Sequence, residues 1–549
     1  MTTEVKFLSL GGIGSVTKNL YVYETEEEIL LVDCGLGFAD ETMLGVDLLL
    51  PDVSYLLKTK KRIVGMCITH GHEDHMGALP FILPQLPVFA IYATPFTAAL
   101  ANVKLAEFEI GTRIIPTDFN TEVKIGNFTA EFIRVTHSVP DTSHILIGTP
   151  AGNFYHGSDF KFDYTPFDGQ KTDFQAITNA GKKGIRCLLS DCLGAERIGF
   201  TPSEEILSVP FEREMRSCKG KFIVTTYSSN ISRLNQIIAV AEKLNKYVCF
   251  IGRSLIKAKD VARDKGLLKL RKEREITADQ LRTFADKDVL LFVAGSQGQE
   301  NSALTRIING EHRDVKLRKD DVVVFSADPI PGNEISVSEL VDVLSGLGNR
   351  VMYSNITHEF HVSGHGSSQE LLLLMSLVNA QQVLPISGTN RQMVAYKNLA
   401  KKFGFKDEDI LLTNAGQELI FTPDTVRLGE KIPLRRIYVD QVSGEEVDHY
   451  VLRDRQKLSK EGIVAIIAEI SAETGELMEK PEIIAKGFSA HETTDIISLA
   501  NVSLKSVLSH KKPVTDWAYI RKQIRDAAEQ KIAKHLRRHP LILPVVIES

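Results

Sequence analysis

The sequence has few cysteines, no long apolar run and no excess of charge of either sign. All six cysteines precede residue 250 and none forms a C-x-x-C pair, which argues against a disulfide scaffold and a cysteine-ligated zinc. We therefore expect small buried hydrophobic cysteines in a reduced compartment. The 65 Lys and Arg against 70 Asp and Glu give a net charge of −5, which excludes a globally basic nucleic-acid binder. Any anionic partner must therefore be bound by a local group of basic residues.

The sequence also shows no pattern typical of a membrane-spanning segment or a signal peptide. The longest apolar runs, such as Leu371 to Met375, are far shorter than the roughly 20 residues that span a bilayer. Residues Met1 to Lys6 lead directly into the strand-like run Phe7 to Leu10, without the basic and apolar regions of a signal peptide. We expect no membrane segment and a cytoplasmic location.

The order of apolar and polar runs divides the 549 residues into several regions. Residues 1–202 alternate short β-rich runs with glycine turns, which predicts a mixed α/β sandwich. Residues 203–350 carry apolar strands that are each followed by a helical pattern, which predicts a separate parallel α/β domain. Residues 351–430 return to strand, loop and helix. The polar stretch 431–460 predicts a linker or peripheral hairpin, and residues 461–549 predict a small α+β domain.

The most informative motif is the segment Thr69 to Gly77, which reads T-H-G-H-E-D-H-M-G and follows an apolar strand. Alternate residues after a strand end point to the same side, so His70 and His72 can share one metal ion while Asp74 and His75 turn toward a second. Two divalent ions about 3.5–4 Å apart suit phosphoryl displacement, since they activate water and stabilise the charge of both oxygens.

Further ligands are expected at other strand ends. His137 would complete the nitrogen set of the first metal, and Asp159 could bridge both ions with its two oxygens. His144 and His156 have no such partner in the pattern, so we expect them to be ordinary buried histidines.

These motifs resemble a known family. The segments that match the metallo-β-lactamase fold are Leu10 to Gly14, Thr69 to Gly77, Thr136 to Asp141 and Gly157 to Asp163. Those that look like its β-CASP branch are Ser190-Asp191, Pro329 to Glu334 and His361 to Gly366. Together they resemble bacterial ribonuclease J over nearly the whole chain. The resemblance implies a metallo-β-lactamase αββα sandwich in two parts (1–202 and 351–430), an inserted β-CASP domain (203–350) and, after the linker, a C-terminal dimerisation domain (461–549).

The resemblance also implies an activity: hydrolysis of single-stranded RNA, 5′ to 3′ from a monophosphorylated end and also internally, in mRNA decay and rRNA maturation. It implies two divalent metals, zinc or manganese. The implied ligands, carried over by position, are His70, His72 and His137 for one metal, Asp74 (also catalytic) and His75 for the other, and Asp159 as the bridge. His365 matches the general acid for the leaving oxygen, and Asp191 a supporting acidic residue. The implied RNA contacts are Ser229, Asn230, Ser232, His361, Val362, Ser363, Gly364 and His365.

One position departs from the family where a ligand is expected. The family reads Pro-Val-His-Gly-Glu where this chain has Pro385-Ile386-Ser387-Gly388-Thr389, so Ser387 replaces the remaining ligand of the second metal. A neutral hydroxyl is a poor substitute for imidazole, which predicts a weakened second site. The segments Ser15 to Asn19, Cys192 to Gly194 and Ile231 to Arg233 also depart from the family pattern.

The combination resembles the second, weaker paralogue of bacteria that carry two ribonucleases of this kind. We expect attenuated activity and assembly as a homodimer or as a hetero-oligomer with an active paralogue, which can form part of an RNA degradosome. An alternative is an independently active manganese-dependent exoribonuclease, in which water or a swung-in His358 or His361 replaces the missing ligand. A third is a small-molecule metallo-hydrolase, because the histidine motif is shared across the superfamily. The inserted domain argues against that third alternative.

Overall fold

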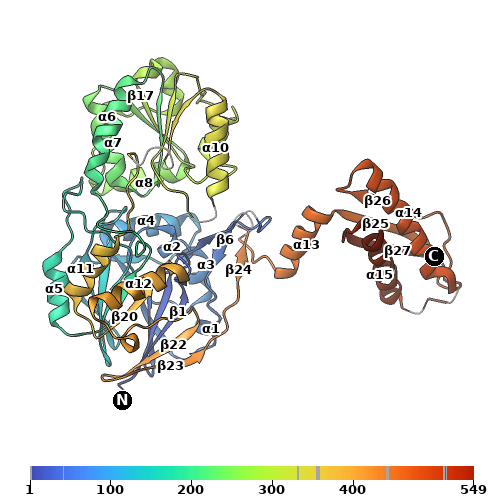
Figure 1. The fold of residues 1–549 in the computed structure, drawn as a ribbon, viewed down its shortest axis with the longest axis horizontal. Helices are drawn as coiled ribbons and strands as arrows, with labels where there is room; N and C mark the ends of the chain where they lie inside the picture. Colours follow the sequence, from blue (N-terminus) through green and yellow to red (C-terminus); the bar gives the residue numbers. More distant parts are fainter. Residues whose placement is uncertain are drawn as a thin grey trace. The chain divides into compact units, whose positions relative to one another are not determined.

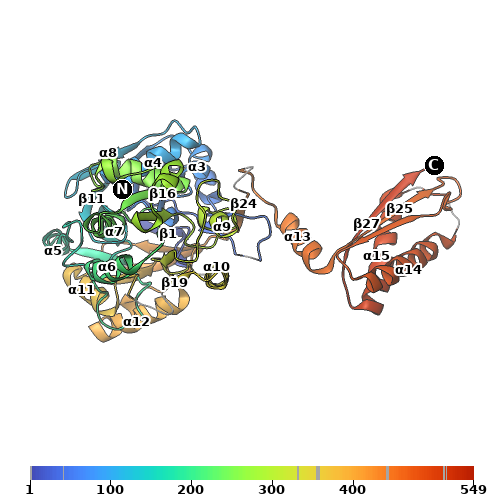
Figure 2. The same cartoon turned by 90° about the horizontal axis from the view of Figure 1, so that it is seen from above.

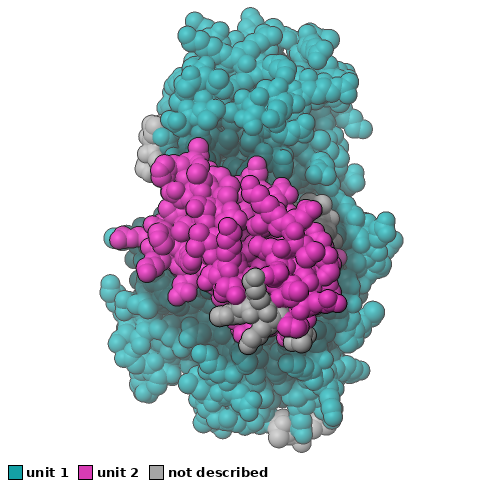
Figure 3. All heavy atoms as spheres, turned by 90° about the vertical axis from the view of Figure 1, so that its right-hand side faces the viewer, with its two compact units in different colours: residues 1–38, 48–437 teal, residues 39–47, 438–549 magenta. Residues whose placement is uncertain are grey.

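The computed structural model describes residues 3–40, 42–330, 333–353, 359–440, 444–510, 513–514 and 516–549. The chain divides into two compact units, one of residues 1–38 and 48–437 and the other of residues 39–47 and 438–549 (Figure 3).

Two β-sheets form the larger part of the first unit. The first has eight strands in the order β23 (Val426–Lys431), β22 (Gln417–Phe421), β1 (Val5–Gly11), β3 (Leu20–Glu24), β4 (Glu28–Val32), β7 (Arg62–Ile68), β8 (Ala90–Ala93) and β9 (Ile114–Pro116). The second has six, in the order β10 (Glu122–Ile125), β11 (Phe128–Arg134), β12 (Ser143–Thr149), β13 (Gly152–Gly157), β14 (Ile185–Asp191) and β20 (Gln382–Ile386).

One hydrophobic core lies between these sheets. Tyr21 and Tyr23 of β3 share it with Phe132 of β11 and Phe154 of β13, all with at most 1% of their surface exposed. Helix α4 (Pro95–Glu107) contacts β8 and β9, while α5 (Phe174–Lys182), α11 (Ser368–Val378) and α12 (Asn390–Phe403) contact the six-stranded sheet (Figure 1). Helices therefore flank two packed sheets, and the predicted αββα sandwich is confirmed.

The inserted domain is built on a five-stranded, all-parallel sheet. Its order is β16 (Tyr247–Ile251), β17 (Val289–Val293), β15 (Phe222–Thr225), β18 (Val322–Phe325) and β19 (Arg350–Met352). All five residues of β17 are buried, as expected for a strand with helices on both faces of its sheet. Those helices are α6 (Ser208–Ser217), α7 (Ile231–Lys243), α8 (Arg253–Asp264) and α10 (Glu334–Gly346) (Figure 2). The predicted boundary at residue 350 falls on the first residue of β19, so the sheet extends two residues beyond it.

The second unit contains a three-stranded sheet covered by two long helices. The strands are β26 (Glu482–Lys486), β25 (Ile463–Ile470) and β27 (Leu541–Glu548), and the helices are α14 (Ala490–Val507) and α15 (Trp517–Leu536). Alternate residues of β25 are buried with the apolar face of the helices, as in a sheet covered on one side. The 431–460 stretch, predicted as a linker or hairpin, contains most of helix α13 (His449–Glu461), whose one buried residue is Leu452.

The shorter elements are α1 (Ser54–Lys58), α2 (Glu73–Met76), α3 (Leu79–Ile82), α9 (Ala303–Ile308), β2 (Ile13–Gly14), β5 (Gly37–Phe38), β6 (Leu48–Leu50), β21 (Gly388–Thr389) and β24 (Ile437–Val439). All six cysteines are free and buried, as predicted. Across the described ranges, the helices that the chain forms are too short or too polar to cross a bilayer.

Candidate metal centre

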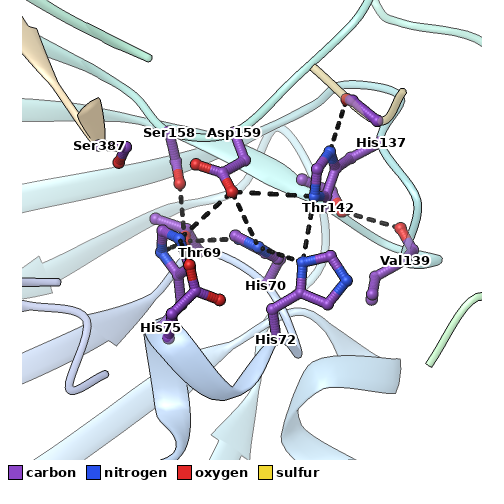
Figure 4. Close-up of polar contacts among 12 residues, drawn as sticks. Thr69, His70, His72, His75, His137, Val139, Thr142, Ser158, Asp159 and Ser387 are labelled. Atoms are coloured by element: carbon purple, nitrogen blue, oxygen red, sulfur yellow. Dashed lines mark hydrogen bonds and ion pairs between the residues drawn. The ribbon is translucent and has the colours of Figure 1, made fainter. Parts of the chain in front are cut away.

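The ends of six strands converge on the candidate site. Strands β11, β13, β14 and β20 run in the same direction, so their carboxyl ends share one edge of the six-stranded sheet. Strands β4 and β7 are parallel neighbours in the facing sheet. The residues at or after these ends are Asp33, Thr69 to His75, His137, Asp159, Asp191 and Ser387. Figure 4 shows most of these side chains pointing toward a common centre.

The first ligand group consists of His70, His72, His137 and Asp159, whose candidate atoms all lie within 4.8 Å of one another. The Nε2 atoms of His70 and His137 each lie 3.1 Å from Nδ1 of His72. Oδ2 of Asp159 lies 3.7 Å from Nε2 of His70 and 3.8 Å from Nε2 of His137. The structure thus brings together the four residues that the sequence predicts for one metal.

These three imidazoles are held neutral. Burial is the largest cause: it lowers the pKa of His72 to about 3 and the pKa values of His70 and His137 well below their ordinary value. Neighbouring imidazoles disfavour the charge further. A neutral imidazole has a free lone pair, which is the form that coordinates a metal.

The second ligand group consists of Asp74, His75 and Asp159. Nε2 of His75 lies 3.6 Å from Oδ2 of Asp74 and 3.4 Å from Oδ2 of Asp159. Burial opposes charge on His75, but the carboxylates of Asp159, Asp74 and Asp33 outweigh it and hold the pKa of this imidazole well above its ordinary value. Burial raises the pKa of Asp74 to about 6.

Asp159 belongs to both groups, and to a third set of candidate donors with Asp191 and His365. Burial would raise its pKa, but the imidazoles of His75 and His365 outweigh this and hold the pKa well below the usual range. Its Oδ1 atom is buried and has no hydrogen-bond partner within the described part of the chain. A buried, unpartnered carboxylate oxygen between imidazoles fits a divalent cation, so the residues present suit the metals that the fold implies.

Hydrogen bonds to Nδ1 orient two of the histidines. Asp33 accepts from Nδ1 of His75 at 2.7 Å and from the backbone N–H of Thr69 at 2.8 Å. The carbonyl of Gly364 accepts from Nδ1 of His137 at 2.7 Å, and a Cβ on Gly364 would lie 2.8 Å from Cε1 of that ring. With Nδ1 as the donor, Nε2 of each ring faces the centre: in His137, whose pKa is lowered, it carries a free lone pair, whereas in His75, whose pKa is raised, a metal would have to displace the Nε2 proton. Asp33 was not among the residues predicted from sequence; the available signal is an acidic residue directly after the fully buried strand β4.

Asn19 supports the second group and was likewise not predicted. Its Nδ2 donates to the carbonyl of Asp74 at 3.0 Å and lies 3.2 Å from Nε2 of His75. The Asp74 carbonyl lies so close to Gly35 that a Cβ there would approach to 1.6 Å, so only glycine fits.

The hydroxyl of Ser387 is directed to Asn19 rather than to a ligand atom. Ser387 follows β20 with a φ of 52° and is 1% exposed. Its Oγ donates to Oδ1 of Asn19 at 3.2 Å, and the same oxygen accepts from the hydroxyl of Tyr21 at 2.8 Å. Figure 4 draws Ser387 without a contact to the histidines.

His361, one of the two proposed substitutes for the missing imidazole, has its ring nitrogens beside other partners than the second group. Nδ1 of His361 lies 2.8 Å from Nη1 of Arg233, and its Nε2 lies 3.3 Å from Oδ2 of Asp328. His358 lies outside the described residues.

His365 lies beside the first ligand group. Its Nδ1 is 2.7 Å from Oδ2 of the fully buried Asp191, and its Nε2 is 3.9 Å from Oδ2 of Asp159. Burial disfavours charge on this ring, but Asp191 and Asp159 outweigh it and raise the pKa of His365. The second oxygen of Asp191 accepts from the backbone N–H of Leu193 at 2.8 Å, which fixes the carboxylate.

The predicted RNA-contact segments meet at one buried guanidinium. Arg233 of α7 is 0% exposed and donates to the carbonyl of Val362 at 3.0 Å, next to its contact with His361. Asn230 caps α7 by accepting from the backbone N–H of Arg233 at 3.0 Å. Ser229, Ser232, Ser363 and Gly364 are partly exposed. The sequence pattern contained Arg233 but assigned it no role.

His144 and His156 lie in the core, as predicted. His144 contacts the hydroxyl of Tyr155 and the carbonyl of Ser158, while Nδ1 of His156 lies 3.0 Å from the hydroxyl of Tyr23. Neither belongs to a metal-ligand group among the described residues.

Comparisons with known proteins agree with this geometry. The family models that match are the metallo-beta-lactamase superfamily (residues 14–176), the ribonuclease J beta-CASP domain (219–344), the Zn-dependent metallo-hydrolase RNA specificity domain (354–411) and the ribonuclease J C-terminal domain (450–549).

Full-length relatives cover the same span. Ribonuclease J2 of Bacillus subtilis is 32% identical over 100% of this chain and 99% of its own length. Ribonuclease J of Thermus thermophilus is 36% identical over 99% of this chain and 95% of its own length. A crystal structure of a protein of unknown function from Enterococcus faecalis, 16% identical, matches 76% of this chain and 100% of its own with a TM-score of 0.56, which supports the fold alone.

Proposed function

The chain belongs to the ribonuclease J family of metallo-hydrolases, and we propose that it binds single-stranded RNA and hydrolyses it slowly, as the weaker partner of an active paralogue. The observation that carries this proposal is the difference between the two ligand groups. The first offers four donor residues, whereas the second offers three and has the hydroxyl of Ser387, turned to Asn19, where the family has an imidazole.

The candidate ligand residues are assigned to two metal ions in this proposal. His70, His72, His137 and Asp159 would hold one zinc or manganese ion, and Asp74 and His75 with the same Asp159 would hold the second. In such sites divalent ions supply activation of water and stabilisation of the phosphoryl charge.

His365 would donate the proton at Nε2 to the leaving oxygen. Its Nδ1 is already bonded to Asp191 at 2.7 Å, which orients the ring and stabilises its protonated form. Asp191 acts through that bond and has no contact of its own with the reacting atoms in this scheme.

Weak binding at the second group is the reason for attenuated activity. Losing a single supporting residue of a metal site commonly lowers affinity or activity by about 10–100-fold, and the loss of a direct ligand belongs at the upper end of that range. In this proposal the chain contributes RNA contacts and assembly, as a homodimer or with the paralogue in an RNA degradosome, to mRNA decay and rRNA maturation in the cytoplasm. Residues 461–549 would serve dimerisation.

Degradation of a 5′-monophosphorylated RNA with added Mn²⁺ tests the proposal. We expect slow shortening by the parent chain, none by the double variant Asp74→Ala, His75→Ala, and a rate about tenfold higher or more for Ser387→His. Histidine is among the side chains that tolerate the left-handed backbone at this position. A Ser387→His rate equal to that of the parent, with the variant folded, would contradict the assigned cause of the attenuation.

The second candidate is an independently active manganese-dependent exoribonuclease. What favours it is that three donors of the second group remain in place, and metal sites often keep a water as a further ligand. The same assay distinguishes the two: a parent rate that Ser387→His does not raise, and that the paralogue does not increase when the two are mixed, would favour independence.

A further inference from the structure

A cavity of about 330 Å³ lies in the first unit, apart from the two ligand groups. Its lining residues come from the end of β1 and the segment after it, from the end of β6 and the segment after it, from Ala415 before β22, and from the end of β23 and the segment after it. Figure 1 labels these strands. Four of its lining residues are basic: Lys18, Lys431, Arg435 and Arg436. Among the described residues that line it, Asp52 is the single acidic one.

The carboxylate of Asp52 is already hydrogen-bonded and balances the charge of one of the four basic residues. Its Oδ2 accepts from the backbone N–H of Arg435 at 2.8 Å and lies 3.5 Å from Nε of the same residue. Its Oδ1 accepts from the backbone N–H of Ser54 at 3.0 Å. The carboxylate therefore neutralises Arg435 and leaves the other cations uncompensated.

The remaining cations, Lys18, Lys431 and Arg436, make no ion pair with a carboxylate in the part of the chain that the structure describes. Burial and the neighbouring charge of Arg436 both lower the pKa of the Lys18 amine. Lys18 is partly buried, and a charge held there beside a like charge costs free energy unless an anion joins them.

We propose that this cavity binds the phosphate group of a nucleotide, either a free nucleoside monophosphate or one residue of an RNA strand. Its volume is at the small end of the range of about 300–1,000 Å³ that ligand sites occupy. The guanidinium of Arg436 suits a phosphate because it can donate two parallel hydrogen bonds. Leu10, Ile13 and Leu434 provide apolar wall for the sugar and base.

The cavity is linked to the metal centre through the backbone. Lys18 directly precedes Asn19, whose backbone N–H donates to the Asp74 carbonyl at 3.1 Å. Gly12, beside the lining residue Gly11, accepts from the backbone N–H of Ser387 at 2.7 Å. An anion held here would therefore fix the loop that carries Asn19 against the second ligand group.

Binding to the full chain in the presence of a chelator tests the site without turnover, so its outcome is independent of whether the chain hydrolyses RNA. The probes are inorganic phosphate and adenosine 5′-monophosphate by calorimetry, and a 5′-hydroxyl single-stranded RNA by fluorescence anisotropy. The test variant is Lys431→Ala, Arg436→Ala, since both residues are exposed. The matched control is Lys124→Ala, Lys402→Ala, which removes the same charge at exposed positions outside the cavity.

We expect the test variant to lose roughly tenfold or more in affinity for at least one probe, as the removal of charge-assisted hydrogen bonds does, while the control stays within about twofold of the parent. A loss for the mononucleotide alone identifies a free nucleotide as the occupant, and a loss for RNA identifies the strand. Equal affinities of parent and test variant for all three probes, or an equal loss in the control, would overturn the proposal.

Discussion

The carboxylate of Asp33 accepts from Nδ1 of His75 and so fixes a hydrogen on that ring nitrogen, and Asp33→Asn removes this acceptor at nearly constant shape. Asp33 is fully buried. Its carboxylate accepts hydrogen bonds from the backbone N–H of Thr69 at 2.8 Å, from the hydroxyl of Thr69 at 2.9 Å and from Nδ1 of His75 at 2.7 Å. An asparagine can keep the bonds to Thr69 with its oxygen. Its amide then faces His75 with a second donor, which forces the ring to carry its hydrogen on Nε2.

Two magnitudes follow from this contact. The lost charge-assisted hydrogen bond lowers the free energy of unfolding by about 1.5–3 kcal/mol. A ring with its hydrogen on Nε2 offers no lone pair to the second group, and loss of such an orienting partner lowers metal affinity or activity by about 10–100-fold, which is about 1.4–2.7 kcal/mol of binding free energy.

The assay separates the two effects with a matched variant. Asp321 in the inserted domain is equally buried, accepts from the backbone N–H groups of Lys221 at 2.7 Å and Arg318 at 2.8 Å, and pairs with Nζ of Lys221 at 2.9 Å. We expect Asp321→Asn to lower the urea midpoint at least as much as Asp33→Asn, while only Asp33→Asn weakens Mn²⁺ binding in calorimetry and slows RNA shortening. Mn²⁺ affinity within twofold of the parent in a folded Asp33→Asn chain would refute the assigned role.

Three further predictions concern the packing around the site. Gly364→Ala should weaken Mn²⁺ binding by about tenfold, because the new Cβ would displace His137, whereas Gly111→Ala, which meets nothing within 4 Å, should leave the affinity unchanged in calorimetry. Arg233→Met should lower the free energy of unfolding by about 3 kcal/mol in urea, because Glu204, now 2.6 Å from the guanidinium, stays buried with only the ammonium of Lys161, 3.5 Å away, as an ionic partner. Burial would raise the pKa of Glu204, but Arg233 outweighs burial and lowers this pKa. The stability that the pair contributes is therefore fully present at a pH above the pKa of glutamate in the unfolded chain, about 4.3, and is lost as the pH falls through the lower pKa of the folded state. The free energy of unfolding, measured in urea between pH 7 and 3, should therefore fall more steeply for the parent than for Glu204→Gln. Parallel curves of unfolding free energy against pH would contradict this prediction.

The grouping of the candidate ligand residues could be predicted because each of them stands in a short local motif. His70 to His75 form one short motif after a strand, and His137 and Asp159 follow β11 and β13, two strands of one sheet that run in the same direction. Once the sandwich fold places those strand ends at one edge, ligand types and spacing are sufficient to assign the groups.

The supporting residues were not predictable, because each depends on a contact between distant segments. Asp33 and His75 are 42 positions apart, His137 and Gly364 are 227 apart, and Arg233 and Val362 are 129 apart. Composition also misleads at α13: its residues are almost all polar, with Leu452 alone buried, so the helix could not be recognised from an apolar stripe.

The two ligand groups differ in how much they depend on position 387. The first is oriented by Gly364 and has neutral imidazoles because of burial, neither of which involves Ser387. The second relies on Asp33 and Asn19, and Asn19 is the residue to which Ser387 donates. In the function proposed above, a hydroxyl at 387 therefore weakens the second group while leaving the first intact. Because turnover in a two-metal hydrolase requires both groups whereas RNA contact does not, such a change lowers the rate of hydrolysis more than it lowers the affinity for RNA.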